Sequence, residues 1–143
     1  MRSMVATSLV FLFLTACPAW GGASADVCAE QVGAAVEVFM AEVFRTARLE
    51  KDISEQDRQK RYTAATEKLV SLVRQLQVDT APLLVLLQQY IDREEGHRSP
   101  PPGWDPDDTK ANLPLFSEMA QQAVRIDLEL VSYGRKFCPS RNP

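Results

Sequence analysis

The sequence predicts an all-α protein, an antiparallel up-down-up-down four-helix bundle whose N- and C-terminal ends are joined by a disulfide. Apolar residues recur at spacings of three and four along four segments, and the alternation typical of strands is rare. Cys28 opens the first segment and Cys138 closes the last. A bond requires their Cα atoms to lie within about 7 Å. An up-down-up-down order meets this requirement because it brings those two ends to the same pole.

The first helix is predicted over residues 26–49. Its acidic Asp26 and its basic Arg45 and Arg48 suit the two ends of a helix dipole. One stripe of apolar residues is expected to face the core. This stripe consists of Cys28, Val32, Ala35, Val36, Phe39, Val43 and Ala47. Gly33, and Gly134 near the other end of the chain, are expected to let the first and last helices approach closely.

The second helix is predicted over residues 55–78, with Ser54 and Asp57 as an N-terminal capping pair. Its core seam is expected to consist of Tyr62, Ala65, Leu69, Leu72 and Leu76. Asp79 or Thr80 caps the third predicted helix, which ends near Gly96. The apolar residues of the third helix cover much of its circumference, which predicts that it is the most buried. They are Leu83, Leu84, Leu86, Leu87, Tyr90 and Ile91.

Residues 97–112 are predicted to form a Pro-rich loop. Three consecutive prolines favour an extended conformation, and a connection of this length is either functional or disordered. Asn112 is expected to cap the last helix, with Pro114 in its first turn. The core stripe of that helix is expected to comprise Phe116, Met119, Ala123, Ile126, Leu130, Tyr133 and Phe137.

The first 25 residues are predicted to be a signal peptide, because Arg2 precedes a short apolar run over residues 5–16. A small-residue cleavage site precedes Asp26. Alternatively, residues 14–17 resemble a lipobox, so that residues 1–16 form a lipoprotein signal, Cys17 is lipidated and residues 17–25 form a tether. Either signal predicts export to the periplasm, soluble or lipid-anchored to the bacterial envelope. In that oxidising compartment Cys28 and Cys138 are expected to pair.

The charge balance argues against nucleic-acid binding. Without residues 1–25 the chain keeps 118 residues (143 minus 25) with 15 basic and 19 acidic side chains, a net charge of −4. An acidic domain has no basic excess for phosphates. It also has no polybasic segment for anionic lipid, so membrane contact is expected only through a lipid at Cys17.

The predicted topology places two connections at the pole opposite the disulfide. The first connection contributes the candidate partner-binding cations Arg45, Arg48, Arg58 and Arg61. The Pro-rich loop contributes Pro101, Pro102 and Trp104. Tryptophan supplies a large contact area at low entropic cost, so Trp104 is either an anchor for a partner or a lid over the end of the bundle. The run from Arg58 to Arg61 is expected to be a solvated helix face.

No catalytic motif, metal site or cofactor site is predicted. His97 is expected to act as a charged cap at a helix end. Glu94 and Glu95 are adjacent in a segment expected to be exposed. Two carboxyl groups in the same solvated environment are not expected to divide into a catalytic acid and a catalytic base. Asp105, with acidic neighbours in the loop, lacks the glycine and glutamate that a calcium loop needs.

The sequence therefore predicts a non-enzymatic, exported helical interaction protein. It would act as an adaptor, an inhibitor or an immunity-type factor that binds another envelope protein. The alternative is a carrier or sensor of small apolar ligands, with a pocket in the bundle core. Phe39, Met40, Phe116, Met119 and the leucines of the third helix are expected to line that pocket.

Overall fold

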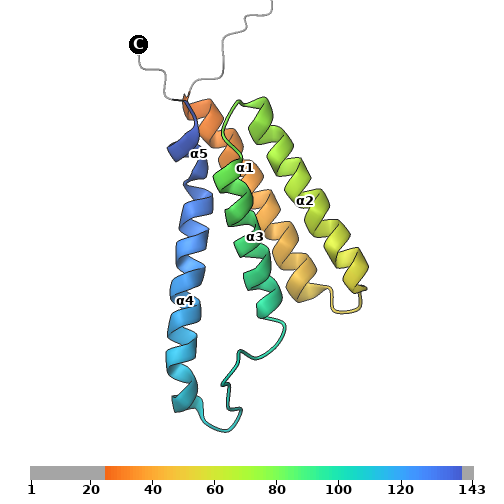
Figure 1. Ribbon diagram of the computed structural model, residues 1–143, viewed down its shortest axis with the longest axis vertical. Helices are drawn as coiled ribbons and strands as arrows, with labels where there is room; N and C mark the ends of the chain where they lie inside the picture. Colours follow the sequence, from red (N-terminus) through yellow and green to blue (C-terminus); the bar gives the residue numbers. More distant parts are fainter. Residues whose placement is uncertain (1–24, 140–143) are drawn as a thin grey trace, which may run out of the picture.

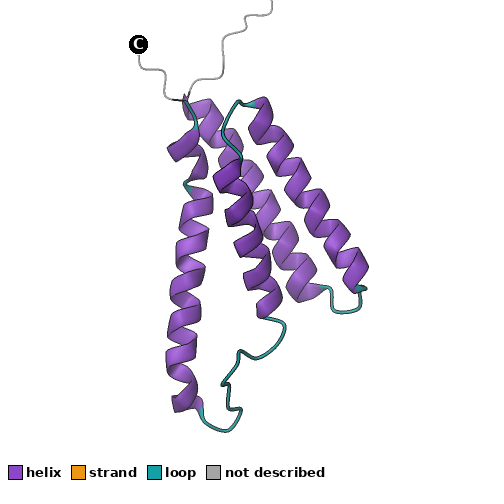
Figure 2. Cartoon of the chain, viewed as in Figure 1, coloured by secondary structure: helices purple, strands orange, loops and turns teal. Residues whose placement is uncertain are grey.

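A computed structural model describes residues 25–139. The lipobox, Cys17 and all but the last residue of the predicted signal peptide lie outside these residues. The regular secondary structure of the described residues is helical, with five α-helices and one π-helical turn joined by loops, and no strand (Figure 2). The elements are α1 (Ala25–Phe44), the π-helical turn η1 (Arg45–Leu49), α2 (Glu55–Gln75), α3 (Ala81–Gly96), α4 (Thr109–Val131) and α5 (Tyr133–Phe137).

The helices pack around α1, which contacts α2, α3, α4 and α5. The last two long helices, α3 and α4, also pack against each other. In Figure 1 the α1–α2 turn and the α3–α4 loop lie toward one end of the molecule. The α2–α3 connection, the start of α1 and the end of α5 lie toward the other.

The predicted first helix is confirmed in position but changes its winding at Arg45. Residues Arg45–Leu49 form a π-helical turn. The consecutive residues Thr46 and Ala47 are both buried in this turn. The other buried residues of this stripe are Cys28, Val32, Val36, Phe39 and Val43, as predicted.

The second helix begins as predicted and ends earlier. The Ser54 hydroxyl accepts a hydrogen bond from the Asp57 amide at 3.1 Å. At the other end, Gln77 adopts a left-handed conformation with φ of 58°. The amide of Val78 donates to the Val73 carbonyl at 3.1 Å, and that of Gln77 donates to Arg74 at 2.9 Å. This pair of bonds is a Schellman motif, and it ends the helix at Gln75 although Val78 stays buried.

The third helix has the largest buried share of the four long helices, as predicted, but part of its apolar surface is exposed. Asp79 accepts a hydrogen bond from the Ala81 amide at 3.0 Å, as expected of a cap. The buried residues fall on one face: Leu83, Leu86, Leu87, Tyr90, Ile91 and Glu94. Leu84, predicted to be buried, is 42% exposed, and Val85 is 58% exposed. Leu84 lies outside the buried face of α3, so the expectation for Leu84 is wrong.

The last helix starts four residues earlier than predicted. Asp108, and not Asn112, is its cap, because the Asp108 carboxylate accepts from the amides of Lys110 and Ala111. Pro114 consequently lies inside α4. The helix breaks at Ser132, whose hydroxyl donates to the Leu128 carbonyl at 2.6 Å. Such a bond to the preceding turn bends helices.

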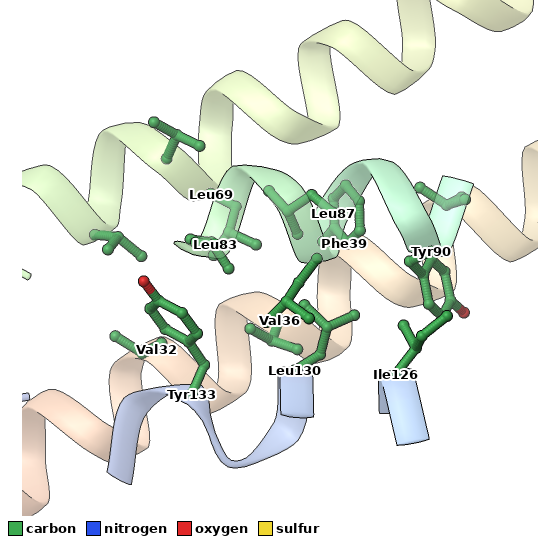
Figure 3. Packing of buried hydrophobic residues seen from close by; sticks show 14 of the residues in the cluster. Val32, Val36, Phe39, Leu69, Leu83, Leu87, Tyr90, Ile126, Leu130 and Tyr133 are labelled. Atoms are coloured by element: carbon green, nitrogen blue, oxygen red, sulfur yellow. The ribbon is translucent and has the colours of Figure 1, made fainter. Parts of the chain in front are cut away.

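The core gathers apolar side chains from α1, α2, α3 and the α4–α5 segment (Figure 3). Tyr133 is fully buried there, as predicted. Its ring stacks on Phe137 at 4.5 Å, and its hydroxyl donates to the Asp79 carbonyl. Phe116, assigned to the core by its spacing, is 46% exposed. The C-terminal part of the stripe predicted for the last helix is therefore buried in the core, whereas Phe116 at its beginning is not.

Cys28 and Cys138 pair as predicted, with Sγ atoms 2.08 Å apart and Cα atoms 6.0 Å apart. Beside this bond, a Cβ atom on Gly134 would lie 2.8 Å from the Ala29 carbonyl oxygen. Only glycine lets the backbones come this close. Gly33 has open space around it, so a role for Gly33 in close helix approach is wrong.

Candidate binding surface

The cations predicted to bind a partner are engaged with carboxylates of the same chain. Arg45 lies 2.7 Å from Glu42 and 3.1 Å from Glu50. Glu50 also accepts a hydrogen bond from Arg61. The Arg45 and Arg61 side chains remain 52% and 39% exposed. They can reach a partner, but the nearby carboxylates neutralise their charge.

Arg48 belongs to a partly buried ionic cluster, centred on Glu94, that ties three elements together. It donates to Glu94 at 2.8 Å, and Glu94 also accepts from Arg93 at 2.8 Å. Arg93 also donates a hydrogen bond to Asp127 of α4 at 2.8 Å. Glu94 is 2% exposed, so the expectation of an exposed carboxylate pair is wrong. Glu94 is buried because it lies on the face of α3 that packs against the core. Arg48 and Arg93 compensate its charge.

The environment of this cluster shifts two titrations. Burial raises the pKa of the Tyr90 hydroxyl to about 12, and the nearby Glu94 adds to the shift. Burial alone would lower the pKa of Arg93, but its hydrogen bonds to Asp127 and Glu94 outweigh that effect and raise it. Arg93 also lies over the Tyr90 ring, with 4.4 Å between its Cζ and the ring centroid. These groups keep their charge states at neutral pH and act as structural ties.

Arg58 is buried, and its predicted place on a solvated helix face is wrong. Only 7% of the residue is exposed. Its guanidinium pairs with Glu55 and lies 3.4 Å from Glu95, without hydrogen-bond alignment at Nε. The Tyr62 hydroxyl donates to the same Glu95 carboxylate. Burial and this carboxylate raise the pKa of Tyr62. Arg58 thus joins α2 to the end of α3.

His97 follows α3 as its C-terminal cap residue, with its amide bonded to the Arg93 carbonyl at 3.2 Å. Burial, together with the charge of Arg48, lowers the pKa of the imidazole below its ordinary value. Burial and the Arg48 charge thus both disfavour the protonated ring. The position expected for His97 is confirmed, and the expected positive charge is not.

The Pro-rich loop contains a tight turn with the sequence of a type II turn. The Trp104 amide donates to the Pro101 carbonyl at 3.0 Å. Pro102 and Gly103 are the two central residues, and Gly103 has φ of 85°. Proline in the first central place and glycine in the second are the residues that this turn requires. The turn sets the direction in which the Trp104 side chain leaves the loop.

Asn112 holds the end of the loop against α4. It is 2% exposed, and its side-chain oxygen accepts from the Asp105 amide at 2.9 Å. Its side-chain nitrogen donates to the Asp105 carbonyl at 2.6 Å. A residue assigned to a helix cap from its sequence position therefore acts as a clamp for the loop. The clamp joins residues seven positions apart across an irregular loop, so helical spacing alone could not identify it.

Trp104 packs against the beginning of α4. Its ring meets that of Phe116 edge to face, with centroids 5.1 Å apart, a favourable geometry for aromatic pairs. Trp104 remains partly exposed, and Pro102 and Asp105 on either side are exposed. The structure thus presents a proline–tryptophan segment on a loop that internal contacts hold in place.

The pocket expected in the core does not form from the predicted residues. A groove of about 460 Å³ lies instead between α1 and α2. Of the predicted lining residues, the leucines of the third helix included, only Phe39 borders it. Its apolar wall includes Val38, Ala65 and Leu69, and Arg61 and Lys68 stand among its polar residues. Sequence periodicity missed this groove because small alanines on facing helices, not large side chains, create the space.

Within residues 25–139, no group of three or more metal-binding side chains comes together. No helix of that part of the chain has the length and apolar content to cross a membrane. Comparison of the chain with models of protein families, with curated proteins and with solved structures finds no match.

Proposed function

We propose that this protein is a non-enzymatic, exported interaction protein that binds another protein of the envelope through its Pro-rich loop. The scaffold is an antiparallel up-down-up-down four-helix bundle with its ends joined at Cys28 and Cys138. Support for this topology comes from the positions of the connections in Figure 1 and from the packing of α1 against the other helices. The N-terminal signal supports export, either as a soluble protein or with a lipid at Cys17.

The held conformation of the Pro-rich loop carries this proposal. A loop that is already ordered loses less conformational entropy when it binds. The Asn112 clamp and the turn at Gly103 supply that order, and Trp104 supplies an aromatic anchor. Asp105 and Asp107 are exposed beside the anchor. The partner that fits this surface has an apolar slot for an indole ring and basic groups at its rim.

We expect Trp104→Ala to weaken capture of the partner at least tenfold, because a tryptophan anchor typically contributes more than about 1.4 kcal/mol. Trp104→Phe retains an aromatic ring and is expected to keep part of the affinity. The measurement is quantitative capture from the envelope fraction, with Leu84→Ala as a control that removes exposed apolar area from α3. Equal capture by Trp104→Ala and wild type would refute the role of the loop.

A second candidate function is the transport or sensing of a small amphipathic ligand, and the groove between α1 and α2 favours it. The groove volume of about 460 Å³ lies in the range of ligand pockets. Its apolar wall suits a hydrocarbon chain, and Lys68 suits an anionic head. We expect a fluorescent fatty acid to bind the wild type, and Ala65→Trp to abolish binding by filling the groove. Unchanged binding by that variant would exclude this site.

A further inference from the structure

A second apolar stripe runs along α4 beside the stripe that faces the core. We name it the α4 ridge, and its members are Leu113, Phe116, Ala120, Val124, Leu128 and Val131. All six are exposed, and the five large ones range from 46% for Phe116 to 64% for Leu128. The 19 residues from Leu113 to Val131 cover about 27 Å of helix. A continuous exposed strip of this length marks an interaction surface.

The spacing of the α4 ridge reads the same in both directions, because successive members are 3, 4, 4, 4 and 3 residues apart. A second, antiparallel copy can be related to the first by a twofold axis at the level of residue 122 along the helix. Every member of the ridge then lies opposite another member of the ridge. The facing pairs are Leu113 with Val131, Phe116 with Leu128, and Ala120 with Val124. A ridge that matches itself in this way is suited to a copy of its own chain.

The charges at the two ends of α4 favour the same antiparallel pairing. The exposed Asp107 and Asp108 precede the ridge, and the exposed Arg135 and Lys136 follow it. Antiparallel pairing brings the acidic end of one copy to the basic end of the other, whereas parallel pairing would bring like charges together. Asp127, which borders the ridge, is already bound by Arg93 at 2.8 Å. The carboxylate that borders the ridge is thus already compensated.

We propose that the α4 ridge is the interface of an antiparallel homodimer, in which a second copy of this chain covers it. Burial of both ridges would remove roughly 1,000 Å² of surface, near the lower bound for a specific interface. The dimer is therefore expected to be reversible. The dimer would hold two Pro-rich loops at opposite ends of the paired helices. It would therefore present the proposed binding surface twice.

Sedimentation equilibrium of the oxidised protein tests this proposal. The wild type is expected to approach twice the monomer mass as its concentration rises. The double substitution Val124→Glu and Leu128→Glu should raise the dissociation constant about 100-fold or more, because it places unpaired charges in an apolar contact. Gln122→Glu adds the same charge on the exposed opposite side of α4 and should change nothing. Circular dichroism confirms that every variant remains folded.

A charge exchange tests the orientation. Lys136→Glu is expected to weaken the dimer, and adding Asp107→Lys should restore it, because only antiparallel pairing brings these two residues together. A wild type that stays monomeric up to millimolar concentration would overturn the proposal. A dimer that survives the double glutamate substitution would also overturn it. If the wild type is monomeric and the ridge variants no longer bind a different protein that the wild type binds, the ridge is the binding site for that partner and the homodimer is refuted.

Discussion

Replacing Cys138 with serine is expected to lower the melting temperature of the oxidised protein by roughly 15 °C. The disulfide joins residues separated by 110 positions. In the chain-entropy model, a loop of this length removes enough freedom from the unfolded chain to stabilise the fold by about 4–5 kcal/mol. The lost bond would also free the α1–α5 contact at Gly134, where the backbones meet most closely.

Calorimetry of three samples measures this effect. The Cys138→Ser protein, the Cys28→Ser/Cys138→Ser protein and the reduced wild type should unfold at similar temperatures, well below the oxidised wild type. The double variant is the control for mispairing by a leftover thiol. The same melting temperature with and without reductant would show that the bond does not stabilise the fold.

Arg93→Met is expected to destabilise the fold by about 3 kcal/mol, because the buried Glu94 carboxylate loses one of its two arginine partners. The Arg93 side chain is 13% exposed, and that of Glu94 is 3% exposed. Methionine keeps much of the aliphatic volume but loses the bonds to Glu94, Asp127 and the Ala123 carbonyl. Glu94 would then depend on Arg48 alone.

Chemical denaturation provides the measurement, with Arg45→Met as the matched control. The Arg45 pair is exposed at the surface, and such pairs contribute at most about 1 kcal/mol. The combined Arg93→Met/Glu94→Leu variant should recover much of the stability, because the remaining Arg48 and Asp127 side chains are 34% and 41% exposed and reach water. A loss no larger for Arg93→Met than for Arg45→Met would contradict the role assigned to this cluster.

Local signals were sufficient for much of the fold. The cap at Ser54 and the apolar periodicity of α1 each depend on residues within a few positions of one another, so they could be predicted from the sequence. The pairing of Cys28 with Cys138 could be predicted because the chain has three cysteines and the third, Cys17, lies in the predicted signal segment. The caps of α4 show where this fails. Asp108 and Asn112 are both good capping residues, and the choice depends on the tertiary contact between Asn112 and Asp105.

The candidate sites divide in the same way. Trp104 and the prolines could be recognised from composition, but the contact with Phe116 joins a loop to a helix face. The burial of Arg58 and Glu94 depends on partners 37 and 46 positions away, Glu95 and Arg48. Charge runs in a sequence carry no information on such pairs. The α4 ridge has a regular spacing, yet Phe116 was assigned to the neighbouring core stripe and obscured it.

A loop held in place for recognition must protect its own amides before any partner binds. Hydrogen exchange of the free, oxidised protein, resolved by NMR, measures this directly. The amides of Trp104 and Asp105 are bonded to Pro101 and Asn112. We expect them to exchange about 100-fold more slowly than in an unfolded peptide of the same sequence, and Asn112→Ala to remove the protection of Asp105. Exchange at the rate of the unfolded peptide would show that the loop is not preorganised, and would contradict the proposed binding surface.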